Sequence, residues 1–297
     1  KYLLEMPRTM KIKLHPASGI GDGLLMMIAA FHLKGEGHEV ILSDHPIKAL
    51  FPEYTYTSDD EADLRIIQNN NSSLIWNILK NRPDNICIFS PKPSPYLTER
   101  DCLFSPHKSM AENIAYATGK ILGKKISKSN GLIPSPVVKD PSLIAMHPSS
   151  ADCRKNWSPQ KFVRLAKILI PSYRVAFIVS PEERTDWEWV LDLGIELPPL
   201  DSLEELKQFL SSAAYFIGND SGPGHLASNL GIPPLTISGN VQQIRLWRPD
   251  FTRGVTITPF FPLPNFKGIN LAIRDKHWAS FVSVHKVLHT FQTLCKK

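Results

Sequence analysis

The chain has 297 residues, which is enough for two domains that each bury their own core. Hydrophobic residues make up 42% of the chain and charged residues 21%, and these fractions fit a soluble globular protein. No apolar run approaches the roughly 20 residues of a membrane span, and the start shows no secretory signal pattern, so membrane-spanning and secreted classes are not expected.

The charge balance is modestly basic, with 34 Lys and Arg residues against 28 Asp and Glu residues and a net charge of +6. This surplus fits a soluble enzyme with a basic surface, and it also fits attraction to an anionic membrane or a phosphorylated acceptor. No RNA or DNA module is recognisable, so no nucleic-acid partner is expected. The four cysteines show neither metal-ligand spacing nor a paired framework, which indicates a reducing compartment.

A strand, turn, helix and strand open the chain after residues 1–9, which we interpret as an extension outside the fold. The strand at 11–14 runs into a glycine-rich turn at 15–23. The apolar run at 24–33 predicts a buried helix, and 39–42 predicts a second strand. A βαβ unit with a glycine-rich first turn is the usual start of a doubly wound sheet.

The middle of the first half carries weaker signals. Strands are predicted at 64–67 and 85–89, and helices at 73–80 and 110–122. The proline-rich segment 129–141 predicts an interdomain linker, which gives a first domain of 1–135. A cluster of lysines, Lys120, Lys124, Lys125 and Lys128, leaves two explanations open: a solvated helix end, or a contact with an acceptor or membrane.

The second domain, predicted at 136–274, repeats strand, loop and helix units. Its predicted strands are 142–146, 174–179, 213–217 and 234–237, and its helices begin near Ser158-Pro159, Ser180-Pro181 and Ser202. Such repeats predict a parallel sheet with helices on both faces, in which ligands bind at the carboxyl ends of the strands. A last helix is predicted within 275–297, because apolar residues recur there at spacings of three and four.

The stretch 213–230 has the order of a phosphate-binding turn: a strand, a glycine-rich loop and a helix predicted at 226–230. Gly222 and Gly224 would let a ligand approach the backbone, and Pro223 would fix the turn. Asp220 would repel a bare phosphate, so we expect it to face hydroxyl groups such as those of a sugar. The alternative is an ordinary βα turn, because neither the dinucleotide nor the P-loop spacing is present.

Three motifs are similar to those of the bacterial heptosyltransferases, glycosyltransferase family 9. The sequence Gly-Asn-Asp-Ser-Gly-Pro-Gly-His-Leu-Ala at 218–227 resembles the family signature Asp-[Ser/Thr]-Gly-x-x-His-Leu. Ser18, Gly21 and Asp22 match Ser-x-x-Gly-Asp, and 155–157 matches Lys-x-Trp. The resemblance implies a GT-B-like α/β fold with two facing Rossmann-like, doubly wound domains, and a terminal helix that returns to the first domain.

The resemblance also implies roles for individual residues. Asp22 would be the general base, with Ser18 and Gly21 beside it on the acceptor side. Lys155 would neutralise the leaving diphosphate without a metal or cofactor. The remaining donor-binding residues would be Ser149, Ser150, Glu182, Glu183, Asp220, Ser221, Gly222, Pro223, Gly224 and His225.

Several of these assignments have alternatives. Arg154 replaces Lys155 if the alignment shifts by one residue, and Lys155 is otherwise a surface residue. His225 would contact a phosphate or serve the helix, and Glu182 and Glu183 would bind a ribose or belong to an ordinary first helical turn. At 238–241 the chain reads Ser-Gly-Asn-Val, where the family usually has Gly-[Pro/Ala]-Thr-[Asp/Ser].

The resemblance therefore implies an inverting glycosyltransferase that moves a heptose from ADP-heptose to a lipopolysaccharide-type glycolipid. Three alternatives remain open: a nucleotide-sugar epimerase, a protein glycosyltransferase, and a catalytically silent sugar-binding protein. The expected location is the cytoplasm, either free or in peripheral contact with the anionic cytoplasmic face of the inner membrane.

Overall fold

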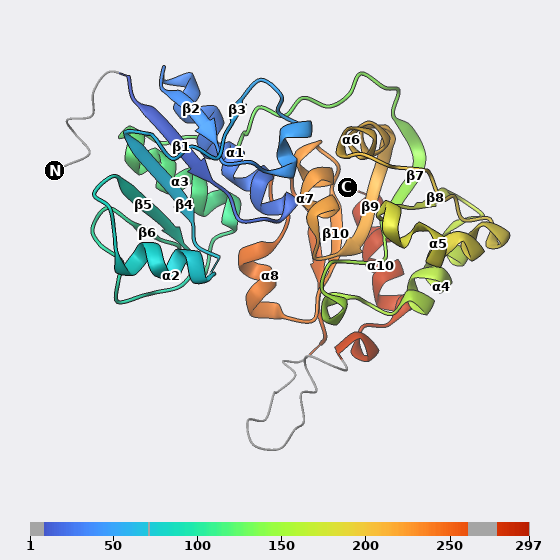
Figure 1. Ribbon diagram of the computed structural model, residues 1–297. Helices are drawn as coiled ribbons and strands as arrows, with labels where there is room; N and C mark the ends of the chain where they lie inside the picture. Colours follow the sequence, from blue (N-terminus) through green and yellow to red (C-terminus); the bar gives the residue numbers. More distant parts are fainter. Residues whose placement is uncertain (1–8, 71, 261–277, 297) are drawn as a thin grey trace. The chain divides into compact units, whose positions relative to one another are not determined.

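The computed structural model describes residues 9–70, 72–260 and 278–296, and the chain divides into two compact units (Figure 1). The first unit is Lys1–Leu132 and the second is Ile133–Lys297. The division lies three residues from the boundary expected at 135. The extension expected at 1–9 falls almost wholly outside the described residues.

The first unit contains a sheet of six parallel strands in the order β3-β2-β1-β4-β5-β6. This is the strand order of a Rossmann fold, and it reverses direction between β1 and β4. Near-continuous apolar runs such as Ile86–Ser90 suit strands that are covered on both faces. The strands are β1 Lys11–His15, β2 Glu39–Leu42, β3 Thr55–Tyr56, β4 Leu64–Gln68, β5 Ile86–Ser90 and β6 Cys102–Leu103.

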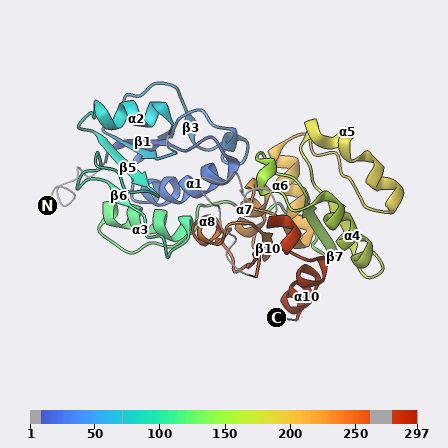
Figure 2. The same ribbon diagram turned by 90° about the horizontal axis from the view of Figure 1, so that it is seen from below.

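Helices cover both faces of this sheet. Helices α1, Ile20–Gly35, and α3, Met110–Leu122, lie together on one face, and α2, Ser73–Lys80, lies on the other (Figure 2). Helix α1 is apolar on nearly all sides because it is buried between the sheet and α3. Helix α3 begins at a capping box formed by Ser109 and Glu112, and it ends at Gly123, whose φ of 65° favours glycine.

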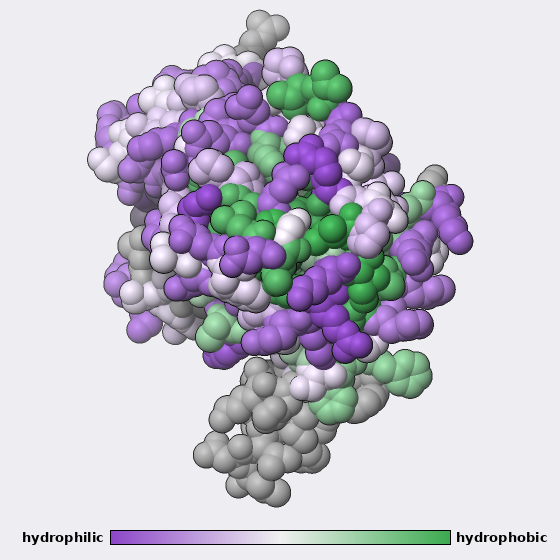
Figure 3. All heavy atoms as spheres, turned by 90° about the vertical axis from the view of Figure 1, so that its right-hand side faces the viewer, coloured by the Kyte–Doolittle hydropathy of each residue, from purple (hydrophilic) through white to green (hydrophobic). Residues whose placement is uncertain are grey.

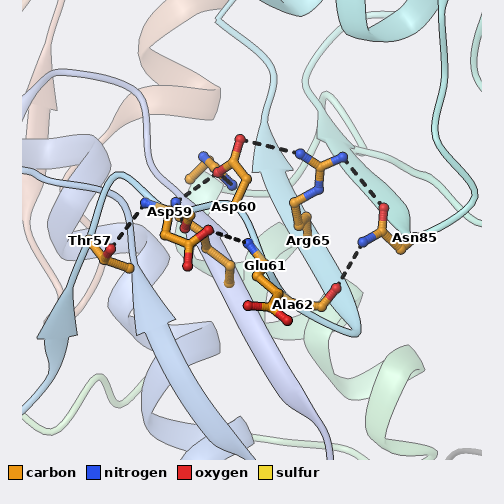
Figure 4. Close-up of polar contacts among 9 residues, drawn as sticks. Thr57, Asp59, Asp60, Glu61, Ala62, Arg65 and Asn85 are labelled. Carbon is orange, nitrogen blue, oxygen red and sulfur yellow. Dashed lines mark hydrogen bonds and ion pairs between the residues drawn. The ribbon is translucent and has the colours of Figure 1, made fainter.

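The connection from β3 to β4 crosses β1 without a helix and is held by a buried lysine. Lys13 of β1 is 1% exposed, and its Nζ donates to the Asp59 carbonyl at 2.5 Å and to Asp60 Oδ1 at 2.7 Å. Arg65 donates to the other oxygen of Asp60 and also to Asn85 (Figure 4). A buried ammonium needs such partners, so this connection is fixed by electrostatics rather than by apolar packing.

The second unit contains five parallel strands in the order β11-β10-β9-β7-β8. Counted within the unit, this is the flavodoxin-like order 2-1-3-4-5, which reverses direction between β7 and β9. Both units are therefore doubly wound parallel α/β folds. The strands are β7 Asp140–His147, β8 Arg174–Phe177, β9 Ala213–Asn219, β10 Pro234–Ile237 and β11 Val255–Ile257.

Helices of the second unit, including the last helix of the chain, pack against the core of that unit. Helices α4 and α10 lie side by side (Figure 2), and their apolar residues pack with those of all five strands in one buried cluster. The helical elements are η3 Cys153–Lys155, α4 Pro159–Leu169, η4 Pro181–Glu183, α5 Arg184–Trp187, η5 Glu188–Leu193, α6 Leu203–Ser212, α7 Gly222–Asn229, α8 Val241–Trp247, η6 Trp278–Phe281 and α10 Val284–Cys295.

The terminal helix α10 packs against the core of the second unit. Val284, Val287 and Phe291 belong to that core, and the apolar stripe of the helix covers β11 and α4. The return of this helix to the first domain, expected from the sequence, stays a prediction. Residues 275–277 of the expected helix lie outside the described residues.

The surface of the second unit carries an apolar area framed by polar side chains (Figure 3). Exposed apolar side chains of the second unit include Ile168 of α4, and Trp189 and Leu191 of η5, each between 46% and 49% exposed. Within the described ranges, every helix is too short or too polar to cross a bilayer.

Candidate functional site

The candidate site of the second unit forms where β7 and β9 end side by side. These strands pair in parallel, with His147 opposite Gly218, and the strand order reverses between them. In open α/β sheets, ligands bind outside the carboxyl ends of the strands at such a reversal. The segments after His147 and after Asn219 are those in which donor-binding residues are predicted, and the fold brings them together.

The turn after β9 differs from the predicted glycine-rich loop. Helix α7 begins at Gly222, four residues earlier than expected, because proline is tolerated in the first helical turn. The amides of Gly224 and His225 donate to the Ser221 carbonyl, and Pro223 has no amide hydrogen. Ser221 does not cap the helix, since its hydroxyl donates to the Asn219 carbonyl at 3.3 Å. The positive helix end is thus left without a side-chain cap.

Lys155 and Asp220 form the charged pair of this site. Lys155 ends the short helix η3, which Asp152 caps through the Arg154 amide, and its Nζ lies 3.5 Å from Asp220 Oδ2. The Lys155 side chain is 39% exposed, whereas that of Asp220 is 8% exposed. A buried carboxylate without a cation would be costly, so Asp220 holds the ammonium group over the end of β9.

Asn219 and Trp157 fix the segment that carries Lys155. Asn219 Oδ1 accepts the Trp157 amide at 2.8 Å, and Asn219 Nδ2 reaches the Ser149 carbonyl at 3.5 Å. The Trp157 ring is fully buried, and its Nε1 donates to the Val282 carbonyl at 2.9 Å. The Lys-x-Trp motif therefore combines an anchor with a charge. Asn219 was not predicted as a site residue, although it directly precedes the signature.

The predicted hydroxyl and carboxylate groups form two smaller networks. Ser149 Oγ donates to Glu183 Oε2 at 2.9 Å, and the Ser180 amide donates to the same oxygen. Glu183 thus ties the end of β7 to the end of β8. Ser150 Oγ lies 2.9 Å from the Asp152 carbonyl and 2.6 Å from Asn156 Oδ1. Glu182 is exposed, and hydrogen bonds from its own backbone and from Ser180 lower its pKa.

His225 is held inside the helix rather than presented to solvent. It is 4% exposed; burial lowers its pKa, while Asp220 and a hydrogen bond to the Trp247 backbone act in the opposite direction. Its Nδ1 has no hydrogen-bond partner among the described residues. In the neutral ring, the nitrogen that donates to a carbonyl carries the hydrogen, so Nδ1 offers a lone pair and no N–H to a phosphate. This geometry favours the structural alternative for His225.

A cavity of about 310 Å³ adjoins the charged pair, within the size range of small-molecule sites. Lys155 and Asp220 line it, and the other lining residues, apart from Arg154 as the alternative to Lys155, were not among the predicted site residues. These are Asp152, Arg154, Ser238, Gly239, Asn240, Gln243 and Trp278.

Trp278 explains one departure from the family pattern at 238–241, the glycine at position 239. A Cβ at Gly239 would lie within 2.4–2.6 Å of the Trp278 indole, so only glycine fits there. Trp278 Nε1 in turn donates to the Arg154 carbonyl at 2.8 Å. No local signal could have revealed this contact, since the glycine and the indole are 39 positions apart in the sequence. Arg154 itself is 74% exposed and pairs with Asp152, which favours Lys155 as the motif's charged group.

The candidate acceptor-side residues lie at the corresponding reversal of the first sheet. Ser18 is exposed in the β1–α1 turn, and Gly21 and Asp22 stand in the first turn of α1. Asp22 Oδ1 accepts a hydrogen bond from Gln68 Nε2 at 2.5 Å. Gln68 is the last residue of β4, the strand next to β1. From the sequence this strand is predicted to end at Ile67, so Gln68 was not among the predicted site residues.

The lysine cluster lies away from this turn. Lys124 pairs with Glu36 at the C-terminus of α1, and Ser127 contacts His32. The segment after α1 leads to Glu39, which is opposite Lys11, the first residue of β1. The cluster is therefore at the amino edge of the sheet, and Asp22 is at the carboxyl edge. The cluster does not lie beside Asp22, and both explanations, a solvated helix end and a contact with an acceptor or membrane, stay open.

The fold is that of solved heptosyltransferases. Escherichia coli heptosyltransferase WaaC, solved with ADP, matches at a TM-score of 0.69 and 12% identity, covering 96% of this chain and 99% of that one. E. coli ADP-heptose lps heptosyltransferase II matches at 0.67 and 14%, covering 97% and 99%. TibC, a dodecameric iron-containing glycosyltransferase of enterotoxigenic E. coli, matches at 0.62 and 15%, covering 99% and 78%.

The sequence places the chain in a family. The family described as glycosyltransferase family 9 (heptosyltransferase) matches residues 105–255, slightly more than half of the chain. The protein therefore belongs to glycosyltransferase family 9. Lipopolysaccharide heptosyltransferase 1 of Campylobacter coli is 33% identical over 119 residues, which cover 37% of this chain and 35% of that relative. The matched segment thus spans about a third of the curated relative's length.

Proposed function

We propose that the protein is an inverting glycosyltransferase that transfers a heptose from an ADP-activated donor to a lipopolysaccharide-type glycolipid. Its family membership gives the reaction class. The similar structures include WaaC with ADP and TibC with ADP-D-β-D-heptose, which supports the donor. The name of the Campylobacter relative supports the acceptor. A glycolipid acceptor would bring the protein to the surface of an anionic membrane.

The observation that carries the donor site is the Lys155–Asp220 pair beside the cavity, at the reversal between β7 and β9. An ammonium group at this position neutralises charge that develops on a leaving diphosphate, and no metal ion is needed for that task. The uncapped start of α7 adds positive potential, and Ser149 and Ser150 supply hydroxyl groups. Asp220 suits sugar hydroxyls, because a carboxylate accepts hydrogen bonds and repels phosphate.

The proposed reaction uses Asp22 as the general base. The carboxylate takes the proton from an acceptor hydroxyl while that oxygen attacks the anomeric carbon. The new glycosidic bond forms as the bond from the anomeric carbon to the phosphate oxygen breaks, and ADP leaves. Attack from the face opposite the leaving group inverts the configuration. Asp22 is supported by its place at the carboxyl edge of β1 and by its fixed contact with Gln68.

A transfer assay tests this proposal. Sugar nucleotides are screened for binding and for ADP or UDP release, with and without glycolipid acceptors. Asp22→Asn should abolish transfer, a loss of about 10²–10⁴-fold for a general base, while ADP affinity stays within about threefold. Loss of donor binding with unchanged turnover would remove Asp22 from the base role.

The same screen separates the alternatives. Conversion of a sugar nucleotide without an acceptor would indicate an epimerase, and transfer to protein alone would indicate a protein glycosyltransferase. Binding without release of the nucleotide in the presence of every acceptor would indicate a sugar-binding protein. Each of these results contradicts the proposed function.

A further inference from the structure

The glycine-rich turn of the first unit makes room for side chains of the protein itself. Gly19 precedes α1 with a φ of −76°, a backbone conformation open to any residue. A Cβ at Gly19, however, would lie 2.7 Å from Asp22 Oδ2. A Cβ at Gly23 would lie 2.6 Å from Cε1 of the His45 ring. The two glycines therefore accommodate a carboxylate and an imidazole.

The hydrogen bonds of His45 define its tautomer. His45 is 5% exposed and precedes the short helix η2, Pro46–Ala49. The Ile47 amide donates to Nδ1 at 3.1 Å, so this nitrogen carries no hydrogen. Nε2 therefore carries the hydrogen and donates to the Ala17 carbonyl at 2.9 Å. Burial lowers the pKa of His45, against the effects of the Ala17 carbonyl and Asp44, so the neutral ring is favoured.

The backbone amide of Ala17 is connected to Asp22 through the side chain of Gln68. The Ala17 amide donates to Gln68 Oε1 at 3.1 Å, and this contact fixes the orientation of the Gln68 amide group. Nε2 of Gln68 must then point the other way, where it donates to Asp22 Oδ1 at 2.5 Å. Gln68 is 2% exposed, so water does not compete for these bonds. One chain of hydrogen bonds runs from Ile47 through His45, Ala17 and Gln68 to Asp22.

We propose that Gln68 and His45 are positioning residues for Asp22, an inference that rests on the proposed role of Asp22 as the base. A carboxylate in the first turn of a helix can rotate towards the helix amides or towards solvent. Gln68 holds one of its oxygens, and His45 holds the turn from which Gln68 is oriented. A base displaced by about 1 Å costs up to about 100-fold in rate, so this restraint acts on turnover rather than on substrate binding.

Gln68→Met tests the first link, because it keeps the side-chain volume and removes both hydrogen bonds. We expect kcat to fall about 10- to 100-fold, with KM for donor and acceptor within about threefold. The control is Asn69→Leu, which removes the neighbouring buried amide and its 2.9 Å bond to Ser90 Oγ. It should lower the unfolding temperature to a similar extent but leave kcat within about threefold. Equal kcat in both variants would overturn the proposal.

A double substitution distinguishes positioning from general damage. In an Asp22→Asn background, Gln68→Met should lower the residual rate by less than about twofold, because the group that it positions is already gone. A further loss as large as that in the wild-type background would mean that Gln68 acts independently of Asp22, and would overturn the proposal.

Gln68→Glu gives the reverse test. It keeps the oxygen for Ala17 but puts a second carboxylate beside Asp22. The rate should be lower than that of Gln68→Met at pH 8 and should recover towards it at pH 5.5, where the pair can share a proton. An unchanged ratio across this range would contradict the contact.

The ring of His45 can be observed without any turnover. Nitrogen NMR of histidine-labelled protein should show His45 with hydrogen on Nε2 and none on Nδ1 at pH 7. The opposite tautomer, or a charged ring, would overturn the hydrogen-bond chain whatever the activity. A wild-type protein that transfers no sugar, but shows this tautomer, would contradict the proposed function and leave the geometry confirmed.

Discussion

Lys155→Met and Asp220→Asn offer a direct test of the donor site, since the two side chains pair before any ligand binds. Coulomb attraction at 3.5 Å is about 1 kcal/mol in bulk water and about 5 kcal/mol at an effective dielectric constant near 20. The 39% exposure of Lys155 places the pair towards the lower end, at about 1–2 kcal/mol. This pairing opposes diphosphate binding, because Asp220 competes with the diphosphate for the ammonium group and also repels it.

The two substitutions should therefore act in opposite directions on ADP. Lys155→Met removes a charged hydrogen bond worth about 1–3 kcal/mol, so ADP affinity should fall about 5- to 150-fold. Asp220→Asn frees the lysine, and ADP should bind equally well or up to about tenfold more tightly. The double variant should bind ADP at least as well as Lys155→Met alone, by no more than the gain seen in Asp220→Asn, because only the repulsion by Asp220 is left to remove. ADP-heptose should lose affinity relative to ADP in Asp220→Asn, because a sugar contact is removed.

Calorimetry with ADP and with ADP-heptose on the three variants measures these differences. Lys167→Met is the matched control, since it removes the charge of an exposed lysine on the outer side of α4. Arg154→Met separates the neighbouring cation, which pairs with Asp152. An ADP affinity in Lys155→Met equal to that of Lys167→Met would refute the diphosphate contact. A loss of ADP binding in Asp220→Asn as large as that in Lys155→Met would refute the assigned roles.

Two further predictions concern acid stability and metal dependence. Burial, against the attraction of Asp60, lowers the pKa of His15 from 6.5 to about 4, so between these values the unfolded state binds more protons than the folded state. The free energy of unfolding should thus fall by about 3 kcal/mol from pH 7 to pH 4 through this residue. Urea titrations at the two pH values should show a smaller fall in unfolding free energy for His15→Gln than for the wild type. Equal falls in the two proteins would contradict the pKa shift. Transfer should persist in EDTA, because Lys155 carries the neutralising charge, and activity that magnesium restores would contradict this expectation.

Helices whose ends are determined by neighbouring capping residues can be predicted from the sequence. Ser109 with Glu112 marks the start of α3 and Gly123 marks its end, and Ser202 with Glu205 marks the start of α6. The strand and helix alternation also predicted two parallel sheets, because each crossover is a short-range pattern. The two-residue strands β3 and β6 were missed, since so short a run has no detectable period.

Other features depend on partners that are distant in the sequence. The apolar stripe of α10 was recognised from the sequence, but its packing against the core of the second unit was not predicted. A stripe shows only that the helix packs against some apolar surface, not which one. Among the candidate site residues, the motif residues were predicted from the resemblance to the family's motifs. Asn219, Gln68 and Trp278 were missed as site residues because their roles lie in hydrogen bonds and packing across 39 to 62 positions.

The two glycine-rich turns show why such motifs are weak evidence for a ligand. A Cβ at Gly218 would lie 2.9 Å from the Phe216 ring, and one at Gly224 would lie 3.3 Å from the same ring. Gly19 and Gly23 accommodate Asp22 and His45 in the same way. At Gly19, Gly23 and Gly218 a protein side chain already explains the glycine, so these glycines do not require a ligand to approach the backbone. The case for a nucleotide in the second unit therefore depends on Lys155, Asp220 and the reversal of strand order.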